Sequence, residues 1–145
     1  MHVLQILKSK ADDAVVTVPP GTAIAKVAAI LAERRIGTVV VSPDDGATAM
    51  GILSERDIVR ELSRQGAGCL NEQVDAYMTT KLVTCTREDS ADDVLTKMTE
   101  GRFRHMPVVE DGQLIGLITL GDVVKARLAE LAMENSALEG MIMGH

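Results

Sequence analysis

The stretch GILSERDI at residues 51–58 returns later in the chain as GLITLGDV at residues 116–123. Both read glycine, two apolar residues, a hydroxyl residue, two variable residues, an aspartate and an apolar residue. The two copies lie 65 residues apart, and the earlier match of Val16-Thr17 with Val83-Thr84 lies 67 apart. A repeat of this length is too long for a solenoid unit and too short for a comfortable separate domain. The sequence therefore predicts two similar halves packed about a pseudo-twofold axis.

The two repeats predict the same order of elements, β-α-β-β-α, which places the chain in the α/β (α+β) class. Short β-rich or apolar runs predict strands, and hydroxyl residues followed by a helical apolar pattern predict helix starts. The expected strands are residues 15–18, 36–41 and 50–53 in the first repeat and 82–84, 106–109 and 114–118 in the second; the expected helices begin near Thr22, Ser54, Ser90 and Asp122.

The repeats also predict the boundaries along the chain. We expect the first repeat, with a short leading helix, to occupy residues 1–70 and the second repeat to occupy residues 71–128. Residues 129–145 continue the last helix beyond the end of its counterpart in the first repeat, so we expect a C-terminal helical extension there.

The composition disfavours several classes of function. Aromatic residues make up only 1 % of the chain and the net charge is −6, so stacking on nucleic-acid bases and attraction to polyanions are both weak. Cys69 and Cys85 form no C-x-x-C pair and the three histidines lack metal-ligand spacing, so we expect no metal site. With neither a signal peptide nor a membrane-spanning apolar stretch, the sequence predicts a cytoplasmic protein that does not bind membranes.

The repeated motif can bind a ligand. A strand that leads into a helix presents free N–H groups and the positive end of the helix dipole, which favour an anion such as phosphate. The hydroxyl of Ser54 or Thr119 can add a hydrogen bond, and the carboxylate of Asp57 or Asp122 suits the vicinal diol of a ribose.

The same residues have a purely structural interpretation. A Ser-x-x-Asp sequence is close to a capping box, in which both side chains satisfy the helix start. Residues 90–93 show this pattern where we expect no ligand. The recurrence after glycine and two apolar residues, at equivalent repeat positions, favours ligand binding, and capping and binding can coexist.

These motifs resemble a tandem pair of cystathionine-β-synthase (CBS) domains, a Bateman module. The two repeated turns carry the resemblance, together with residues 104–109 (RHMPVV) and 77–79 (YMT), and it extends from about Leu4 to Leu128. The long closing helix is similar to that of stand-alone two-CBS proteins. The resemblance implies a regulatory module that binds AMP, ATP, NAD(H) or a related adenosine ligand between its halves.

The resemblance also assigns roles to residues. It implies that Asp57 and Asp122 hold ribose and that Ser54 and Thr119 meet phosphate. Of the other expected ligand-binding residues, Arg56 is a phosphate ligand, Arg104 and His105 line the cleft, Thr17 and Thr84 meet the adenine or sugar, and Val39, Met106 and Pro107 sandwich the base, with Thr38 beside them.

Two departures from the family pattern predict unequal sites. Gly121 stands beside Asp122 where the first repeat has Arg56, which weakens the case for phosphate binding there. Val40 stands where the second repeat has Pro107.

The last helix carries an apolar stripe at alternating spacings of four and three, with one polar member that can fix register between two helices. The stripe fits either packing on the protein's own domain or a partner helix, and family members usually form homodimers. Its members are Val124, Leu128, Leu131, Asn135, Leu138 and Ile142.

We therefore interpret the chain as an adenine-nucleotide sensor that acts on an unidentified regulated protein, without catalytic residues or a catalytic cofactor. One alternative is a protein-interaction regulator, for example of a thioredoxin-type redox partner, in which nucleotide is structural. A nucleotide hydrolase using Asp57 or Asp122 lacks a visible base and metal ligands. RNA binding is disfavoured by charge and composition.

Overall fold

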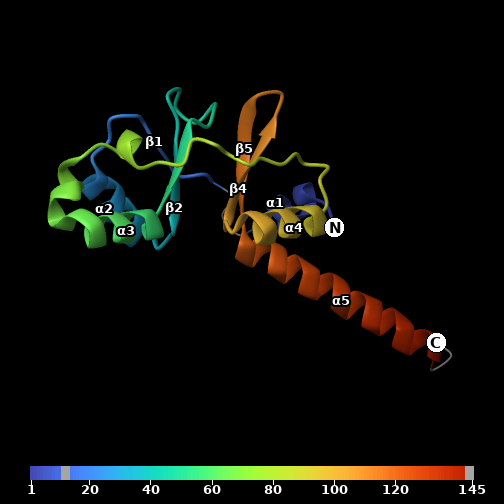
Figure 1. Cartoon of the computed structure of the whole chain (residues 1–145). Helices are drawn as coiled ribbons and strands as arrows, with labels where there is room; N and C mark the ends of the chain where they lie inside the picture. The colour runs from blue at the N-terminus through green and yellow to red at the C-terminus, as the bar shows by residue number, and fades with distance from the viewer. Residues whose placement is uncertain (11–13, 143–145) are drawn as a thin grey trace. The chain divides into compact units, whose positions relative to one another are not determined.

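The computed structural model describes residues 1–10 and 14–142, which divide into two compact units (Figure 1). Unit 1 consists of residues 1–10, 84–108 and 116–142, and unit 2 of residues 14–83 and 109–115. The mixture of helices and small sheets confirms the predicted class. The elements are α1 (Val3–Ser9), β1 (Thr17–Val18), α2 (Ile24–Arg34), β2 (Thr38–Val41), β3 (Gly51–Ser54), α3 (Glu55–Gln65), the 3-10 helices η1 (Gly66–Asn71) and η2 (Val74–Ala76), α4 (Ala91–Gly101), β4 (His105–Glu110), β5 (Gln113–Thr119) and α5 (Leu120–Ile142).

Unit 2 is built on a three-stranded sheet of order β1-β2-β3. Strand β1 runs parallel to β2, with Thr17 opposite Val40, and β3 runs antiparallel to β2, with Thr38 opposite Ser54. The central strand β2 is Thr-Val-Val-Val and is buried along its whole length, as β-branched residues favour. Because β3 passes directly into α3, this register sets the position of the strand-to-helix turn beside the start of β2.

The core of unit 2 forms where α2 and the sheet meet. Helix α2 buries Ile24, Val27 and Leu31, which recur at spacings of three and four residues and so share one face. They belong to one apolar cluster with Val39 of β2 and Leu53 of β3.

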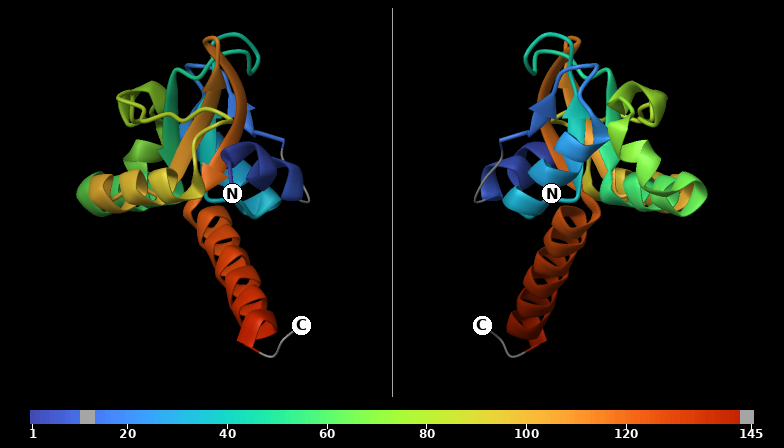
Figure 2. Two further views of the ribbon diagram at one scale, coloured as in Figure 1. Left: turned by 90° about the vertical axis from the view of Figure 1, so that its right-hand side faces the viewer. Right: turned by 90° about the vertical axis from the view of Figure 1, so that its left-hand side faces the viewer.

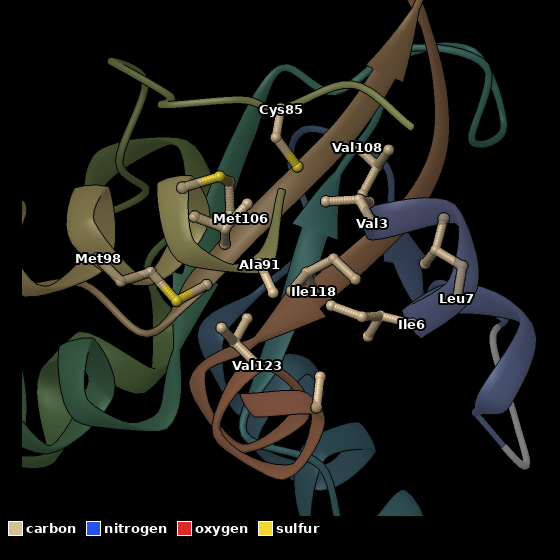
Figure 3. Close-up of a cluster of buried hydrophobic side chains, with 12 residues drawn as sticks. Val3, Ile6, Leu7, Cys85, Ala91, Met98, Met106, Val108, Ile118 and Val123 are labelled. Carbon is tan, nitrogen blue, oxygen red and sulfur yellow. The ribbon is translucent and has the colours of Figure 1, made fainter. Parts of the chain in front are cut away.

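Unit 1 repeats this plan with different surroundings. Strands β4 and β5 form a two-stranded sheet, as predicted, and the turn at Asp111-Gly112 that joins them lies in residues 109–115, which group with unit 2. Helices α1, α4 and α5 cover the core of this unit, and Figure 3 shows its side chains. The core contains Val3, Ile6 and Leu7 of α1, Ala91, Val94 and Met98 of α4, Met106 and Val108 of β4, Ile118 of β5, Val123 and Ala126 of α5, and Cys85.

The strand predicted at residues 82–84 is wrong. Only an isolated parallel bridge forms, one residue later, between Cys85 and Val108. It is the counterpart of the Val18–Val41 pair in the first repeat, 67 residues earlier. Val83 has 43 % of its surface exposed, so this run has little apolar burial to hold it against a sheet. The second repeat therefore keeps the strand pairing of the first at this position, but as a single bridge in place of a strand.

Backbone geometry repeats as closely as sequence does. Helix α2 ends at Arg35 with φ 55°, and α4 ends at Arg102 with φ 56°. Both are left-handed C-cap residues, a position that glycine usually occupies. The matching arginines of the two repeats thus mark the same helix end.

The leading helix packs with the second repeat, although the predicted boundaries group it with the first. The side chain of Leu7 lies over Gly116, where an added Cβ would come within 2.8 Å of Leu7 Cδ2. In unit 2, Met78 lies over the equivalent Gly51, where a Cβ would come within 2.6 Å of Met78 Sδ. The motif glycine of each repeat is therefore covered by the segment that precedes the other repeat in sequence.

Helix α5 extends well beyond the other helices of unit 1, as both views of Figure 2 show. Its first turns bury Val123 and Ala126, and Arg127 pairs with Asp92 of α4 at 2.9 Å. From Leu131 to Ile142, every residue except Gly140 is exposed. Among the described residues, no helix has the length and apolarity needed to cross a membrane.

Candidate functional site

The two strand-to-helix turns form nearly identical hydrogen-bond patterns. In unit 2, Asp57 Oδ2 accepts from Ser54 N at 2.9 Å, and Asp57 N donates to Ser54 Oγ at 3.3 Å. In unit 1, Asp122 Oδ2 accepts from Thr119 N at 2.9 Å, and Asp122 N donates to Thr119 Oγ1 at 3.1 Å. Both are reciprocal capping boxes. The structural interpretation of the motif therefore holds in both repeats, whatever else these side chains do.

The helix starts retain little free hydrogen-bonding capacity. The N–H of Glu55 donates to Gly37 O at 2.8 Å, and the N–H of Leu120 donates to Arg104 O at 2.8 Å. With the aspartate N–H groups also bonded, Arg56 and Gly121 hold the remaining first-turn N–H groups in the described part of the chain. An anion at either turn would therefore depend on side-chain cations more than on the helix start.

A hollow of about 540 Å³ lies at the turn of unit 1. Arg104 and His105 from the start of β4 line it together with Thr119, as the sequence predicted for a shared site. The cations of Arg104 and Lys125 stand beside an apolar wall from α5, so the hollow offers both charge for an anion and surface for a ring. The remaining lining residues are Leu120, Gly121, Val124, Lys125 and Leu128.

A smaller hollow of about 390 Å³ lies at the turn of unit 2. It is lined by Glu55, Arg56, Val59 and Arg60, which are the repeat equivalents of Leu120, Gly121, Val124 and Lys125. The repeat thus builds the same helix face twice, with a valine beside a cation in each. The two differ where Arg56 fills the position that Gly121 leaves open.

The two aspartates have different cationic partners. Asp57 Oδ1 accepts from Arg60, one helical turn along, at 3.2 Å, and the arginine side chain is 63 % exposed. Asp122 Oδ2 accepts from Lys10, at the end of α1, at 2.9 Å, and the lysine side chain is only 20 % exposed. Burial raises the pKa of Asp122, but hydrogen bonds from the Thr119 backbone and from Lys10 outweigh it, so the net pKa lies below its ordinary value.

Neither aspartate lines the adjacent hollow. Each carboxylate turns back to its own helix start, and a ribose at Asp57 or Asp122 would have to reach it there.

Two predicted base contacts need correction. Val39 and Met106 have no exposed surface and pack in the cores of units 2 and 1. Both side chains are filled into their own cores and leave no exposed surface with which to sandwich a base. Their residue type follows from core packing on alternate strand positions.

The other predicted residues are distributed over both units. Thr38 is 5 % exposed, and its Oγ1 has no hydrogen-bond partner among the described residues. Pro107 is also buried, Thr17 is half-buried and Thr84 is exposed on the segment that lacks a strand. Arg56 and Arg104 are exposed, and His105 is half-buried.

Three basic residues at these turns, Arg60, Lys125 and Lys10, were not predicted. Lys125 lines the larger hollow. It could have been found by extending the match between the repeats three residues past Asp122, where Lys125 aligns with Arg60. Lys10 precedes the first repeat and bonds a residue 112 positions away, and no local pattern in the sequence signals that contact.

Neither cysteine offers a reactive thiol. Cys69 and Cys85 are both free and buried, and burial raises the pKa of Cys85 to about 12. Within residues 1–10 and 14–142, no three His, Cys, Asp or Glu side chains gather as metal ligands.

Comparison with known proteins shows the family to which the chain belongs. Residues 8–64 and 74–129 each match the family model described as the CBS domain. The chain is 35 % identical over 117 residues to the CBS domain-containing protein CBSX3, mitochondrial, of Arabidopsis thaliana, covering 79 % of this chain and 57 % of that protein. The chain thus spans little more than half of this relative, and 23 % of the Arabidopsis protein CBSCBSPB3.

Solved structures show the same fold. A CBS-domain containing protein from Agrobacterium tumefaciens is 43 % identical with a TM-score of 0.82, covering 88 % of this chain and 99 % of that one. A CBS domain protein from Pyrobaculum aerophilum, complexed with AMP, is 26 % identical with a TM-score of 0.78, covering 92 % of this chain and 99 % of that one.

Proposed function

Because the chain belongs to the CBS-domain family, with two CBS domains, we propose that it is a regulatory module that binds an adenosine-containing ligand of the AMP, ATP or NAD(H) type. The observation that carries the proposal is the hollow in unit 1, where Arg104, His105 and Thr119 meet beside an apolar helix face. The cations of Arg104 and Lys125, which also lines this hollow, suit a phosphate, and the apolar face suits a base. AMP bound to a relative at 26 % identity supports the ligand class.

The first-repeat turn supports a second site of the same class. Arg56 and Arg60 supply two cations in the smaller hollow. The buried Thr38 hydroxyl, opposite Ser54 in the sheet, is left without a partner. An unpaired buried hydroxyl costs about 1–3 kcal/mol, which a bound ligand or water would relieve. The proposed ligand contacts in this unit are Thr17, Thr38, Ser54, Arg56 and Asp57.

The proposed role is regulation rather than catalysis. A ligand that binds one conformation better than another shifts the population between them, and a partner protein reads the change. We propose cytoplasmic action on an unidentified protein, although the plant relative named above is mitochondrial.

Titration calorimetry with AMP, ATP and NADH tests the ligand class. We expect the wild-type chain to bind at least one of them, and Asp57→Ala with Asp122→Ala to weaken that binding at least tenfold, because both ribose acceptors are removed. Asp93→Ala is the matched control: Ser90 caps α4 through Asp93 N at 3.1 Å, and no ligand is expected there. Unchanged affinity in the double variant would contradict the proposed site. Failure of all three compounds to bind wild type would favour the protein-interaction alternative.

We further propose that two copies pair through the stripe on α5. Leu128, Leu131, Leu138 and Ile142 are 45–77 % exposed, and this length of helix is marginal in water without a partner. Asn135 occupies the one polar position of the stripe, as in helix pairs whose register is fixed by a buried amide.

Analytical ultracentrifugation tests whether two copies pair through this stripe. Leu131→Lys should convert a wild-type dimer to monomer at micromolar concentration, since it buries a charge in the proposed seam. Met133→Lys, off the stripe and 70 % exposed, should leave the dimer intact. A monomeric wild type, or a dimer unaffected by Leu131→Lys, would contradict the pairing.

A further inference from the structure

Lys10, at the end of α1, bonds the Asp122 carboxylate at the start of α5. Its Nζ lies 2.9 Å from Asp122 Oδ2 and 2.9 Å from the carbonyl oxygen of Leu117 on β5. With two acceptors from two elements and a side chain only 20 % exposed, the ammonium is held in place rather than solvated. An ammonium has three N–H donors, so one remains for another acceptor.

Within residues 1–10 and 14–142, the structure shows no counterpart of this contact in the first repeat. The residue 67 positions after Lys10 is Tyr77, whose hydroxyl bonds Glu72 and Gln65. Asp57 instead pairs with Arg60 of its own helix. The ion pair at Asp122 is therefore particular to the second repeat.

The difference bears on the charge of a ligand. Beside Asp57, Arg60 pairs with the carboxylate, and Arg56 lines the same hollow as Arg60. Beside Asp122, Gly121 supplies no charge, and a Cβ added there would meet only Thr119 Oγ1, at 3.7 Å. Arg104 and Lys125 line this hollow, and an unpaired Asp122 carboxylate beside it would weaken their attraction for a phosphate; the structure shows that carboxylate paired with Lys10.

We infer that Lys10 sets the charge preference of the second-repeat site: its ammonium cancels the charge of Asp122 and thereby allows a phosphate-bearing ligand to bind beside it. This inference rests on the proposed function. Lys10 replaces, from a distant segment, the cation that the first repeat carries at Arg56. It acts as a specificity residue, favouring nucleotides over nucleosides.

Paired titrations with AMP and adenosine test the inference. Every protein carries Asp57→Ala, so that one site is measured, and the readout is the ratio of the adenosine Kd to the AMP Kd. Lys10→Met should lower this ratio about fivefold, since the ammonium that offsets the charge of Asp122 is lost. Lys10→Arg should keep the ratio, because it keeps the charge. Lys8→Met is the matched control: it removes the same charge from an exposed position of α1 and should leave the ratio unchanged.

Two results would overturn the inference. One is an equal ratio in Lys10→Met and its parent, which would make Lys10 purely structural. The other is tighter binding of both ligands by the same factor, which would make Lys10 a competitor for Asp122. If Lys10→Met unfolds, the comparison rests on Lys10→Arg and Lys10→Gln, of which only the former should keep the ratio. A parent that binds neither compound would instead refute the proposed second-repeat site itself.

Discussion

The turns at Asp57 and Asp122 have the same backbone and different surroundings. Both are capping boxes, and in each the first helical N–H donates at 2.8 Å to the carbonyl of the residue just before the neighbouring strand, Gly37 before β2 and Arg104 before β4. Asp57 keeps its charge partner on its own helix, at Arg60, whereas Asp122 takes Lys10 from a distant segment. Duplication therefore preserves what a helix start requires locally, and the two sites diverge at Arg56 and Gly121 and in the residues that approach from elsewhere.

The largest expected effect concerns the glycines that open the two motifs. Gly51→Ala should cost about 3 kcal/mol and Gly116→Ala about 2 kcal/mol, because overpacking displaces core side chains. The first is worse because an added Cβ also lies 3.1 Å from the Thr79 carbonyl oxygen, which cannot rotate away. Urea unfolding measures both. Gly68→Ala, with no atom within 4 Å, is the control and should be nearly neutral. Equal costs at all three positions would refute this packing account.

The next effect separates the two aspartates. Asp122→Ala should cost about 2 kcal/mol, since it removes a cap and leaves Lys10 half-buried without its partner. Asp57→Ala should cost about 1 kcal/mol, the value of a cap alone, since exposed Arg60 returns to water. Thermal or urea unfolding of the two variants gives the difference. A larger loss of stability in Asp57→Ala than in Asp122→Ala would contradict this ranking of the two aspartates.

The pH dependence of stability tests the role of the Asp122 carboxylate further. The folded pKa of Asp122 is lowered, so its contribution is present above the unfolded value of about 3.9 and is lost as pH falls through the folded pKa. The stability difference between wild type and Asp122→Asn should therefore be constant from pH 7 to about 5 and shrink below about 4. Urea unfolding at pH 7, 5 and 3.5 measures it. A difference that grows on acidification would contradict the sign.

The smallest effect should be the same in both repeats. Arg35→Gly and Arg102→Gly should each stabilise the fold by about 0.5 kcal/mol, since glycine adopts φ near 55° without strain. Arg34→Gly, inside the last turn of α2, should instead destabilise by about 1 kcal/mol. Opposite signs for Arg35→Gly and Arg102→Gly would show that the helix ends differ after all.

Local chemistry made much of this structure predictable from sequence. The capping residues at Ser54 and Thr119 and the fold class follow from short-range patterns. Arg104, His105 and Thr119 were expected to share a site, and the structure brings them to one hollow. Repeat matching was the strongest signal, because each motif was read twice.

Long-range packing is where the sequence failed. The contacts of Leu7 with Gly116 and of Met78 with Gly51 exchange the segments that precede the repeats, and no periodicity encodes such an exchange. Val39 and Met106 were assigned to a ligand although a strand's alternate positions send them into the cores. The strand at 82–84 failed because β-rich composition alone cannot supply burial.

The most direct test of the central claim is an AMP titration of the 15N-labelled wild-type chain followed by amide NMR. The account predicts that the amides of Arg56, Asp57, Gly121 and Asp122 shift in a saturable manner while that of Asp93, at the start of α4, stays still. If the resonances of both repeated turns remain unmoved at millimolar AMP, the assignment of an adenosine ligand to these turns is wrong.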